Sequence, residues 1–264
     1  MALITSKDNP HILRFTALRD NRSRRREEGS FVVEGLRLCE ESASAPGVEL
    51  DALLFTTTAL ERFGSAIGAF ERKAHRSLLI TDGLGRKISD TKSPQGVFAI
   101  CRLLDKSTEL ATIENGGRYL LLENVQDPGN LGTILRTADA FGIDGIVVTE
   151  GSCDLYNPKV LRATMGSVFR IPVAVDASAS TAAQAFRQAG VPLFAAVAED
   201  AAPVASCDFL QGGAVCIGNE GNGLSDALIA LCDRRITIPM RGGAESLNAA
   251  MAAGIFMWEM ARSR

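Results

Sequence analysis

Residues 119–136 read YLLLENVQDPGNLGTILR, which is an apolar run followed by a polar turn and the start of a helix. The apolar run, residues 119–122, is typical of a buried strand. Asp127-Pro128-Gly129 forms the turn, and Asn130 is predicted to cap the helix with its side chain. Arg136 lies six positions further, nearly two turns along and not directly above Asn130. By itself, the stretch also fits a capped helix with a solvated arginine.

The same theme recurs along the rest of the chain. Apolar runs separated by helical stretches or glycine-rich loops lie at residues 146–148, 172–175, 193–197, 214–217 and 236–238. Such alternation predicts an α/β fold with a mostly parallel sheet covered on both faces. Ligands of such sheets bind beyond the carboxyl ends of the strands, so the loops after these runs are the place to look for chemistry.

A second, smaller α/β domain is predicted ahead of this one. Helical segments follow Pro10 and cover residues 36–41 and 60–73, and short strands are predicted at residues 31–33, 53–55, 78–81 and 97–101. The 264 residues suffice for two cores. We place the first domain at residues 1–106, a polar linker at 107–117 and the second domain at 118–264.

Basic residues are concentrated in the front half of the chain. The formal net charge is −3, yet residues 1–106 carry 17 Lys and Arg against 14 Asp and Glu, and the remainder carries 11 against 17. Between residues 14 and 26 the only acidic residue is Asp20. This segment predicts contact with a polyanion such as RNA, although a solvated helix face would have the same composition. The candidate RNA-binding residues are Arg14, Arg22, Arg24, Arg25 and Arg26.

Two further loops carry polar residues at predicted strand ends. Residues 218–225, GNEGNGLS, hold three glycines, which permit close approach of backbone to a ligand, and one charge, Glu220. They do not match a phosphate-binding loop. Residues 238–248, IPMRGGAESLN, lead into the last helix, where Ser246 or a neighbour is predicted as the cap and Ser246 and Asn248 can hold a ligand. A plain turn and a helix cap remain the alternatives.

Other patterns exclude several kinds of chemistry and location. Both histidines, His11 and His75, precede the linker, which excludes histidine-based catalysis in the second domain. No spacing suits a metal site, and we expect the six cysteines to be buried thiols and no metal to be bound. We expect no membrane span and no signal peptide, hence a cytoplasmic protein. Leu247, Met251, Ile255 and Trp258 form an apolar helix face, expected in the core or at a subunit interface.

Together these segments resemble the SpoU branch of the SPOUT RNA methyltransferases, also called the TrmH family. The residues from Asn130 to Arg136, then 218–225, then 238–248 resemble its three motifs in order, and residues 157–166 resemble a further family segment. Residues 29–35 and 93–96 are similar to the substrate-binding domain that precedes the catalytic domain in many members. Two departures, Thr164 in place of serine and Ala249-Ala250, leave the target open.

The resemblance implies a fold, a cofactor and a set of site residues. It implies a trefoil knot and a homodimer formed through the second domain. S-adenosylmethionine would be bound by Gly218, Ile238, Met240 and Leu247, and Lys159 and Arg162 would add RNA contacts. The catalytic set would be Asn130, Arg136, Glu220, Ser246 and Asn248. We expect Arg136 to act as a phosphate clamp and leave the proton acceptor open, because an arginine keeps its charge at neutral pH.

The expected function is methylation of a ribose 2′-hydroxyl in structured RNA, and ribosomal RNA is the preferred expectation for the substrate. Transfer RNA is the alternative substrate, and the sequence leaves open whether the modification serves housekeeping or resistance to a ribosome-targeting antibiotic. A non-catalytic RNA-binding assembly factor and a small-molecule enzyme that uses the same crevice are the rival classes of function.

Overall fold

The computed structural model describes residues 1–104, 113–243 and 245–262. They form two compact units. The first comprises Met1–Leu104 together with Tyr156–Phe169, and the second comprises Asp105–Leu155 and Arg170–Arg264. Of the predicted linker, residues 107–112 lie outside the described residues. Tyr156–Phe169 belongs to the first unit although it falls inside the segment predicted as the second domain.

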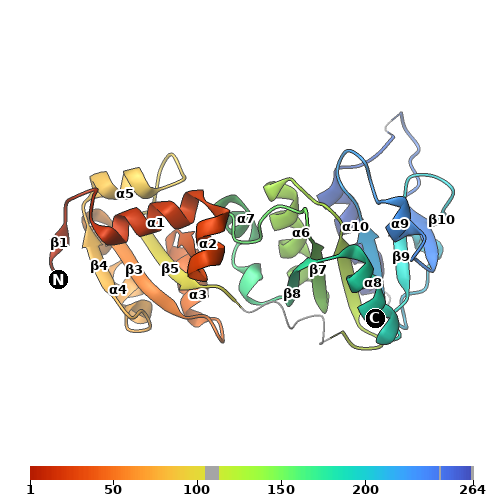
Figure 1. Cartoon of the computed structure of the whole chain (residues 1–264), viewed down its shortest axis with the longest axis horizontal. Coiled ribbons are helices and arrows are strands. Elements are labelled where there is room, and N and C mark those ends of the chain that lie inside the picture. Colours follow the sequence, from red (N-terminus) through yellow and green to blue (C-terminus); the bar gives the residue numbers. More distant parts are fainter. Residues whose placement is uncertain (105–112, 244, 263–264) are drawn as a thin grey trace. The chain divides into compact units, whose positions relative to one another are not determined.

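The first unit is built on a mixed five-stranded sheet (Figure 1). Its spatial order is β1-β4-β3-β5-β2, in which β4 is parallel to β1 and β3, whereas β5 is antiparallel to β3 and β2. The strands are β1 (Leu3–Ile4), β2 (Ser30–Glu34), β3 (Leu50–Thr56), β4 (Ser77–Ile80) and β5 (Val97–Arg102). The four strands predicted in this part are therefore present, and the two-residue β1 is an addition that was not predicted.

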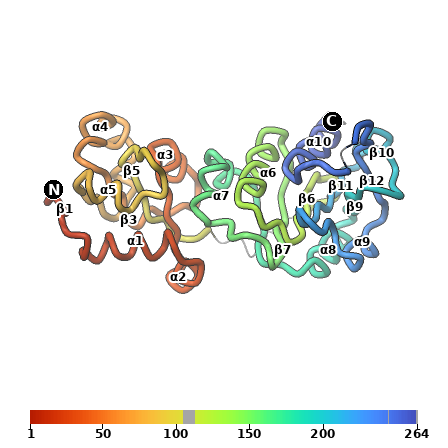
Figure 2. Tube along the Cα trace, turned by 90° about the horizontal axis from the view of Figure 1, so that it is seen from above, coloured from red at the N-terminus to blue at the C-terminus, as the bar shows by residue number. Residues whose placement is uncertain are grey.

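Helices cover both faces of this sheet, as Figure 2 shows for α1 on one side and α3 and α4 on the other. Side chains of α1 and α5 share a buried core with alternate strand residues such as Phe98. The helix α7 packs against β2. The helices are α1 (Pro10–Asp20), α2 (Arg22–Glu28), α3 (Leu36–Ser44), α4 (Thr57–Glu71), α5 (Asp82–Ile88) and α7 (Pro158–Thr164).

The basic segment after Pro10 forms two helices and not one. Asn21 has extended backbone angles and ends α1, and its Oδ1 accepts hydrogen bonds from the backbone N–H groups of Ser23 and Arg24 at the start of α2. An asparagine in this position is a strong helix cap.

The second unit has a seven-stranded sheet in which every described pair of strands is parallel, in the order β10-β12-β9-β11-β6-β7-β8. This confirms the predicted α/β class with a mostly parallel sheet. All six strands predicted in this part are present, and the two-residue β10 is an addition. The strands are β6 (Arg118–Leu122), β7 (Gly145–Thr149), β8 (Val173–Ala177), β9 (Leu193–Ala196), β10 (Ala202–Pro203), β11 (Gly213–Ile217) and β12 (Arg234–Thr237).

The helices of this unit form two layers, with α6 and α10 on one side of the sheet and α8 and α9 on the other (Figure 2). The α8 and α9 layer packs on alternate strand residues, among them Leu121 and Cys216. The other layer packs α10 directly against α6. The helices are α6 (Pro128–Phe141), α8 (Ala179–Gln188), α9 (Asp226–Ile229) and α10 (Ala249–Arg262).

The predicted apolar face of α10 does not face the core. Met251 and Trp258 are 63% and 54% exposed, Leu247, just before the helix, is 38% exposed, and the buried positions are instead Ala249, Ala250, Ala253, Phe256, Met257 and Met260. Of the two expectations for this face, core and subunit interface, the structure removes the first. Apolar residues thus lie on both sides of α10, so a simple spacing of three and four could not tell which side is buried.

Two other expectations concern thiols and membranes. Burial raises the pKa of the Cys101 thiol to about 12, and Cys39 and Cys216 are also buried, as predicted for inert core thiols. The other three cysteines, Cys153, Cys207 and Cys232, are only partly buried, so the prediction of six buried thiols holds for three of them. Within residues 1–104, 113–243 and 245–262, no helix is both long and apolar enough to cross a bilayer.

Candidate functional site

The candidate site lies at the carboxyl edge of the second unit's sheet. Because β6, β11 and β12 run parallel, the loops that follow them leave the sheet at the same edge. These loops are the turn at residues 123–130, the loop at 218–225, here called the glycine loop, and the segment at 238–248. They are the three segments singled out in the sequence.

The glycine loop is closed on itself. Asn219 and Gly223 exchange two backbone hydrogen bonds of 3.0 and 2.9 Å, and Asn219 Oδ1 accepts from the N–H groups of Gly221 and Asn222. Gly218 must be glycine, because a Cβ there would lie 2.1 Å from the carbonyl carbon of Gly223. The sequence of this loop therefore specifies a compact turn with its backbone packed against itself.

Glu220 joins the glycine loop to the turn after β6. Its carboxylate accepts hydrogen bonds from the backbone N–H groups of Gln126 and Asp127, at 3.2 and 3.1 Å, and from Asn130 Nδ2 at 3.0 Å. Partial burial acts to raise the pKa of Glu220, but these hydrogen bonds outweigh it and hold the pKa below its usual value. Glu220 is therefore an ionised, hydrogen-bonded anchor at neutral pH.

Asn130 does not cap α6, contrary to the sequence prediction. The cap is Asp127, whose Oδ1 accepts from Asn130 N at 2.8 Å, with Pro128 in the first helical position. Asn130 thus lies in the first turn of the helix with its side chain available for other contacts, and it is only 8% exposed. The carboxamide uses this freedom to reach Glu220.

Asn248 brings the third segment to the same place. Its Nδ2 donates to Asn130 Oδ1 at 2.9 Å, and its own Oδ1 accepts from the N–H groups of Ala250 and Met251. Asn248 rather than Ser246 therefore caps α10. The structure brings together Asn130, Glu220 and Asn248 into one hydrogen-bonded chain, although Asn130 lies 90 positions from Glu220 and 118 from Asn248 in the sequence.

Arg136 and Ser246 are placed differently from these three residues. Both are exposed, and among the described residues no hydrogen bond or ion pair involves the Arg136 guanidinium or the Ser246 side chain. The structure does not link either residue to the Glu220–Asn130–Asn248 chain. Arg136 is nonetheless a cation on α6 that is open to solvent, two turns from the linked residues.

Three of the four residues predicted to hold the cofactor carry apolar side chains that are not fully buried. Met240 and Leu247 are 39% and 38% exposed, which is high for apolar side chains on a loop. Ile238 is half-buried, and Gly242 and Gly243 have open space where a side chain would stand. Apolar surface beside unobstructed backbone suits an adenosine, which needs both apolar contact and backbone hydrogen bonds.

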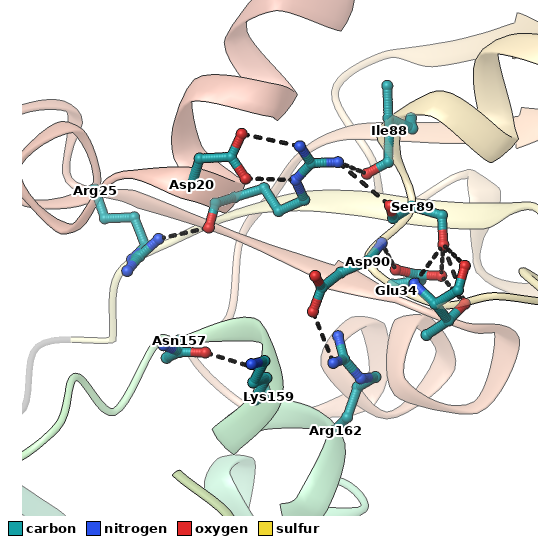
Figure 3. Close-up of polar contacts among 11 residues, drawn as sticks. Asp20, Arg25, Glu34, Ile88, Ser89, Asp90, Asn157, Lys159 and Arg162 are labelled. Atoms are coloured by element: carbon teal, nitrogen blue, oxygen red, sulfur yellow. Dashed lines mark hydrogen bonds and ion pairs between the residues drawn. The ribbon is translucent and has the colours of Figure 1, made fainter. Parts of the chain in front are cut away.

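The structure corrects the role expected of Arg25. This residue is 4% exposed, and its Nη1 donates to the backbone carbonyl of Leu18 at 2.6 Å. It also donates to the backbone carbonyl of Arg19 at 3.0 Å, which is the contact drawn from Arg25 in Figure 3. These carbonyls lie in the last turn of α1, where no backbone N–H of the helix is available to donate to them. Arg25 therefore holds the end of α1, and its burial removes it from the surface that RNA could reach.

Three other predicted RNA-binding residues are engaged in ion pairs within the first unit. Arg14 pairs with Glu28 and Asp51, and Arg24 pairs with Glu28 as well. Arg162 donates to Asp90 Oδ2 at 2.7 Å, as Figure 3 shows. Lys159 lies on the same helix as Arg162, and its side chain is exposed. Arg22 is partly exposed and Arg26 is exposed.

Comparison with known proteins assigns these features to a family. The chain matches the SpoU rRNA Methylase family over residues 117–258, and an MRM3-like substrate binding domain over residues 9–99. The chain belongs to the SpoU rRNA methylase family. The predicted family, fold class and enzyme class, a methyltransferase, are confirmed.

Relatives of this SpoU methylase include two named enzymes of ribosomal RNA modification. The chain is 33% identical to the 23S rRNA (guanosine(2553)-2′-O)-methyltransferase RlmP of Bacillus subtilis, over 89% of this chain and 90% of the relative. It is 31% identical to the 23S rRNA (uridine(2479)-2′-O)-methyltransferase of Streptomyces viridochromogenes, over 99% of this chain and 92% of the relative. A crystal structure of an rRNA methyltransferase from Sinorhizobium meliloti, with bound AdoMet, shares 32% identity with a TM-score of 0.87, covering 99% of this chain and 97% of that one. The predicted cofactor is thus the one bound by a relative of the same fold.

Sequence reasoning missed several residues of this SpoU site. Asp127 caps α6, and the pairing of an Asp with a following Pro at the first helical position could have identified it. Glu123, Asn219 and Ser225 also hold the glycine loop, and they carried no signal beyond lying near strand ends. Their partners are about a hundred residues away in the chain, and a single sequence does not show such pairs.

Proposed function

We propose that this SpoU enzyme transfers the methyl group of S-adenosylmethionine to a ribose 2′-hydroxyl of ribosomal RNA. The observation that carries the proposal is the hydrogen-bonded chain Glu220–Asn130–Asn248, which joins the three predicted motifs at one edge of a parallel sheet. A polar, internally satisfied network at this edge is what a preorganised site requires. Family membership supplies the type of reaction.

Gly218, Ile238, Met240 and Leu247 would hold the cofactor, with the carboxy-terminal segment threaded as a trefoil knot. Bound there, the cofactor supplies a methyl group already activated by a sulfonium. In the reaction the S–C bond to the methyl breaks, a C–O bond to the ribose forms, and the hydroxyl proton is released. The task of the protein is therefore to align two groups and to manage one proton.

Arg136 is proposed as a phosphate clamp that also stabilises charge in the transition state. A guanidinium keeps its proton at neutral pH and binds a phosphate with two parallel N–H groups. Ser246 and Asn248 would orient the ribose. The lowered pKa of Glu220 makes this carboxylate a weak base, which supports an anchoring role for it and leaves the proton acceptor to a group of the RNA or to water.

The first unit is proposed to bind RNA through basic side chains that are exposed or partly exposed. These are Arg22, Arg24 and Arg26 on α2 and Lys159 on α7, all in the same unit. Contacts of this kind bind phosphates without regard to sequence and position the RNA for the active site.

The exposed apolar face of α10 is proposed to form a homodimer interface. Met251 and Trp258 are exposed, and the ring of Trp258 contacts that of Phe141 on α6 with centroids 5.8 Å apart. Exposed aromatic and methionine side chains on a helix face are typical of subunit contacts. A cytoplasmic location accords with ribosomal RNA as substrate.

The deciding experiment incubates the purified protein and labelled S-adenosylmethionine with RNA. Total ribosomal RNA and total transfer RNA are tested in separate reactions. We expect label in ribosomal RNA, at a ribose, mapped by mass spectrometry of nucleosides. Label only in transfer RNA would replace the substrate proposed here, and RNA binding without transfer would favour the assembly factor. The two named relatives act on guanosine and uridine, so the base is to be read from the mapped position.

A further inference from the structure

Glu123, the first residue after β6, contacts both ends of the glycine loop. Its backbone N–H donates to the carbonyl of Ile217, just before the loop, at 2.8 Å. Its carboxylate accepts from the N–H and from the hydroxyl of Ser225, at the far end of the loop, each at 2.7 Å. One residue therefore spans the mouth of the loop, with two short, charge-assisted hydrogen bonds at one end.

The glycine loop behaves as one piece because its own backbone is closed between Asn219 and Gly223. Its position relative to the sheet depends on contacts made at its edges. Glu220 anchors the middle of the loop to the turn at residues 126–130, and Asn219 Nδ2 donates to the carbonyl of Asn124 at 2.9 Å. Ser225 anchors the end, where its hydroxyl also accepts from Leu228 N and so caps α9.

The contact of Glu123 with Ser225 is separate from the proposed catalytic residues. The cavity beside it is lined by Thr149, Glu150 and Asn222, among others, and Asn130, Glu220 and Asn248 do not line that cavity. Both carboxylate oxygens of Glu123 are engaged with Ser225, so they are committed to the loop. A change at Glu123 would act on the position of the loop backbone and not directly on the reacting atoms.

We propose that Glu123 is a positioning residue for the cofactor, which latches the Ser225 end of the glycine loop and thereby fixes the backbone at Gly218. The inference rests on the proposed function, in which Gly218 contacts S-adenosylmethionine. A loop that loses the anchor at its Ser225 end samples more positions, and the affinity for a ligand falls with the fraction of molecules in the binding-competent position. The predicted effect is on cofactor binding, with the chemical step left intact.

The test measures the dissociation constant for S-adenosylmethionine by calorimetry with the full-length protein. Glu123→Ala should raise this constant about tenfold or more, since hydrogen bonds to charged groups are stronger than neutral ones. With cofactor and RNA both saturating, kcat should stay within about twofold of wild type. The matched control is Glu150→Ala, a glutamate on the wall of the same cavity whose carboxylate has no hydrogen-bond partner among the described residues. It should leave the constant unchanged.

Conservative variants separate positioning from general support of the fold. Glu123→Gln keeps one carbonyl oxygen for Ser225 N and should recover most of the affinity lost in Glu123→Ala. Ser225→Thr keeps the hydroxyl for both Glu123 and α9 and should bind the cofactor as wild type does. A common loss of affinity across these variants that follows only their melting temperatures would overturn the positioning role.

Two failures are distinguishable. Wild-type protein that does not bind S-adenosylmethionine contradicts the proposed function itself. Wild-type protein that binds the cofactor, together with a Glu123→Ala variant of equal affinity or of reduced kcat at saturation, contradicts only the role given to Glu123.

Discussion

The side chain of Asn248 donates from Nδ2 to Oδ1 of Asn130 at 2.9 Å, and this bond fixes the orientation of both carboxamides. Asn248 Oδ1 is held by the N–H groups that begin α10, so its Nδ2 must point to Asn130. Asn130 Oδ1 then accepts, and its Nδ2 points to Glu220. Donors are thus aligned in one direction, from the helix terminus to the carboxylate.

Asn130→Asp should disrupt this alignment more than its small change in shape suggests. The substitution removes the N–H group that donates to Glu220 and places two carboxylates side by side. The expected cost in free energy is about 1–3 kcal/mol. We expect methyl transfer to fall at least about tenfold. Labelled transfer to ribosomal RNA measures the effect. Asn222→Asp, which puts the same charge on the exposed part of the glycine loop, is the control, and an equal loss in both variants would contradict the alignment.

Arg136→Ala should abolish methyl transfer and leave the fold intact. The guanidinium is exposed and makes no hydrogen bond or ion pair with the described part of the chain, so its removal leaves no group unsatisfied. Thermal unfolding and methyl transfer, measured on the same preparation, give the two readouts. Arg136→Lys keeps the charge without the planar fork and should retain a fraction of the activity. Full activity in Arg136→Ala would end the role assigned to this residue.

Arg25 and Arg26 are adjacent, yet their substitution should have opposite consequences. Arg25→Ala removes hydrogen bonds from a buried cation to the end of α1 and should lower the free energy of unfolding by about 1.5–3 kcal/mol. Arg26→Ala should leave stability nearly unchanged and reduce the salt dependence of RNA binding by about one phosphate contact. Denaturant unfolding and RNA titrations at several salt concentrations test the pair. A lower salt slope with Arg25→Ala at unchanged stability would contradict its structural role.

The contribution of Glu220 to the free energy of unfolding should depend on pH. Its pKa is lowered from the ordinary value of 4.5, so the folded state favours the ionised form. This contribution is complete above that ordinary value and disappears as the pH falls through the lowered pKa. The difference in melting temperature between wild type and Glu220→Gln should therefore be largest near neutral pH and shrink on acidification. A pH-independent difference for Glu220→Gln would contradict the interpretation.

Trp258→Glu should convert the proposed dimer to a monomer. A charge in an apolar interface is costly to bury, and Trp258 is exposed in the single chain, so the folded subunit should tolerate the change. Light scattering after size exclusion measures the mass. Lys in place of Met251, on the same face, should act likewise. A wild-type protein that is already monomeric would contradict the proposed dimer interface.

The sequence was sufficient for every strand except the two-residue β1 and β10, because apolar runs are local signals. Sequence-based prediction failed where the role of a residue depends on contacts with residues far away in the chain. Asn130 has the properties of a helix cap, but Asp127 takes that position, and Glu220 and Asn248 engage the asparagine instead. Arg25 and Arg26 have the same neighbours in the sequence, so the sequence cannot distinguish them. Arg25 is buried only because α2 packs against α1. The two apolar sides of α10 could be told apart only once α6 was placed against it.

The segment Tyr156–Phe169 belongs to the first unit, whereas the chain on either side of it belongs to the second. The units are consequently joined by three covalent crossings, at residues 104–105, 155–156 and 169–170. A hybrid enzyme that borrows the front half of a relative by a single exchange near residue 106 would combine β2 of one parent with α7 of the other. Functional chimeras should therefore require these fourteen residues, 156–169, to be exchanged together with the front half.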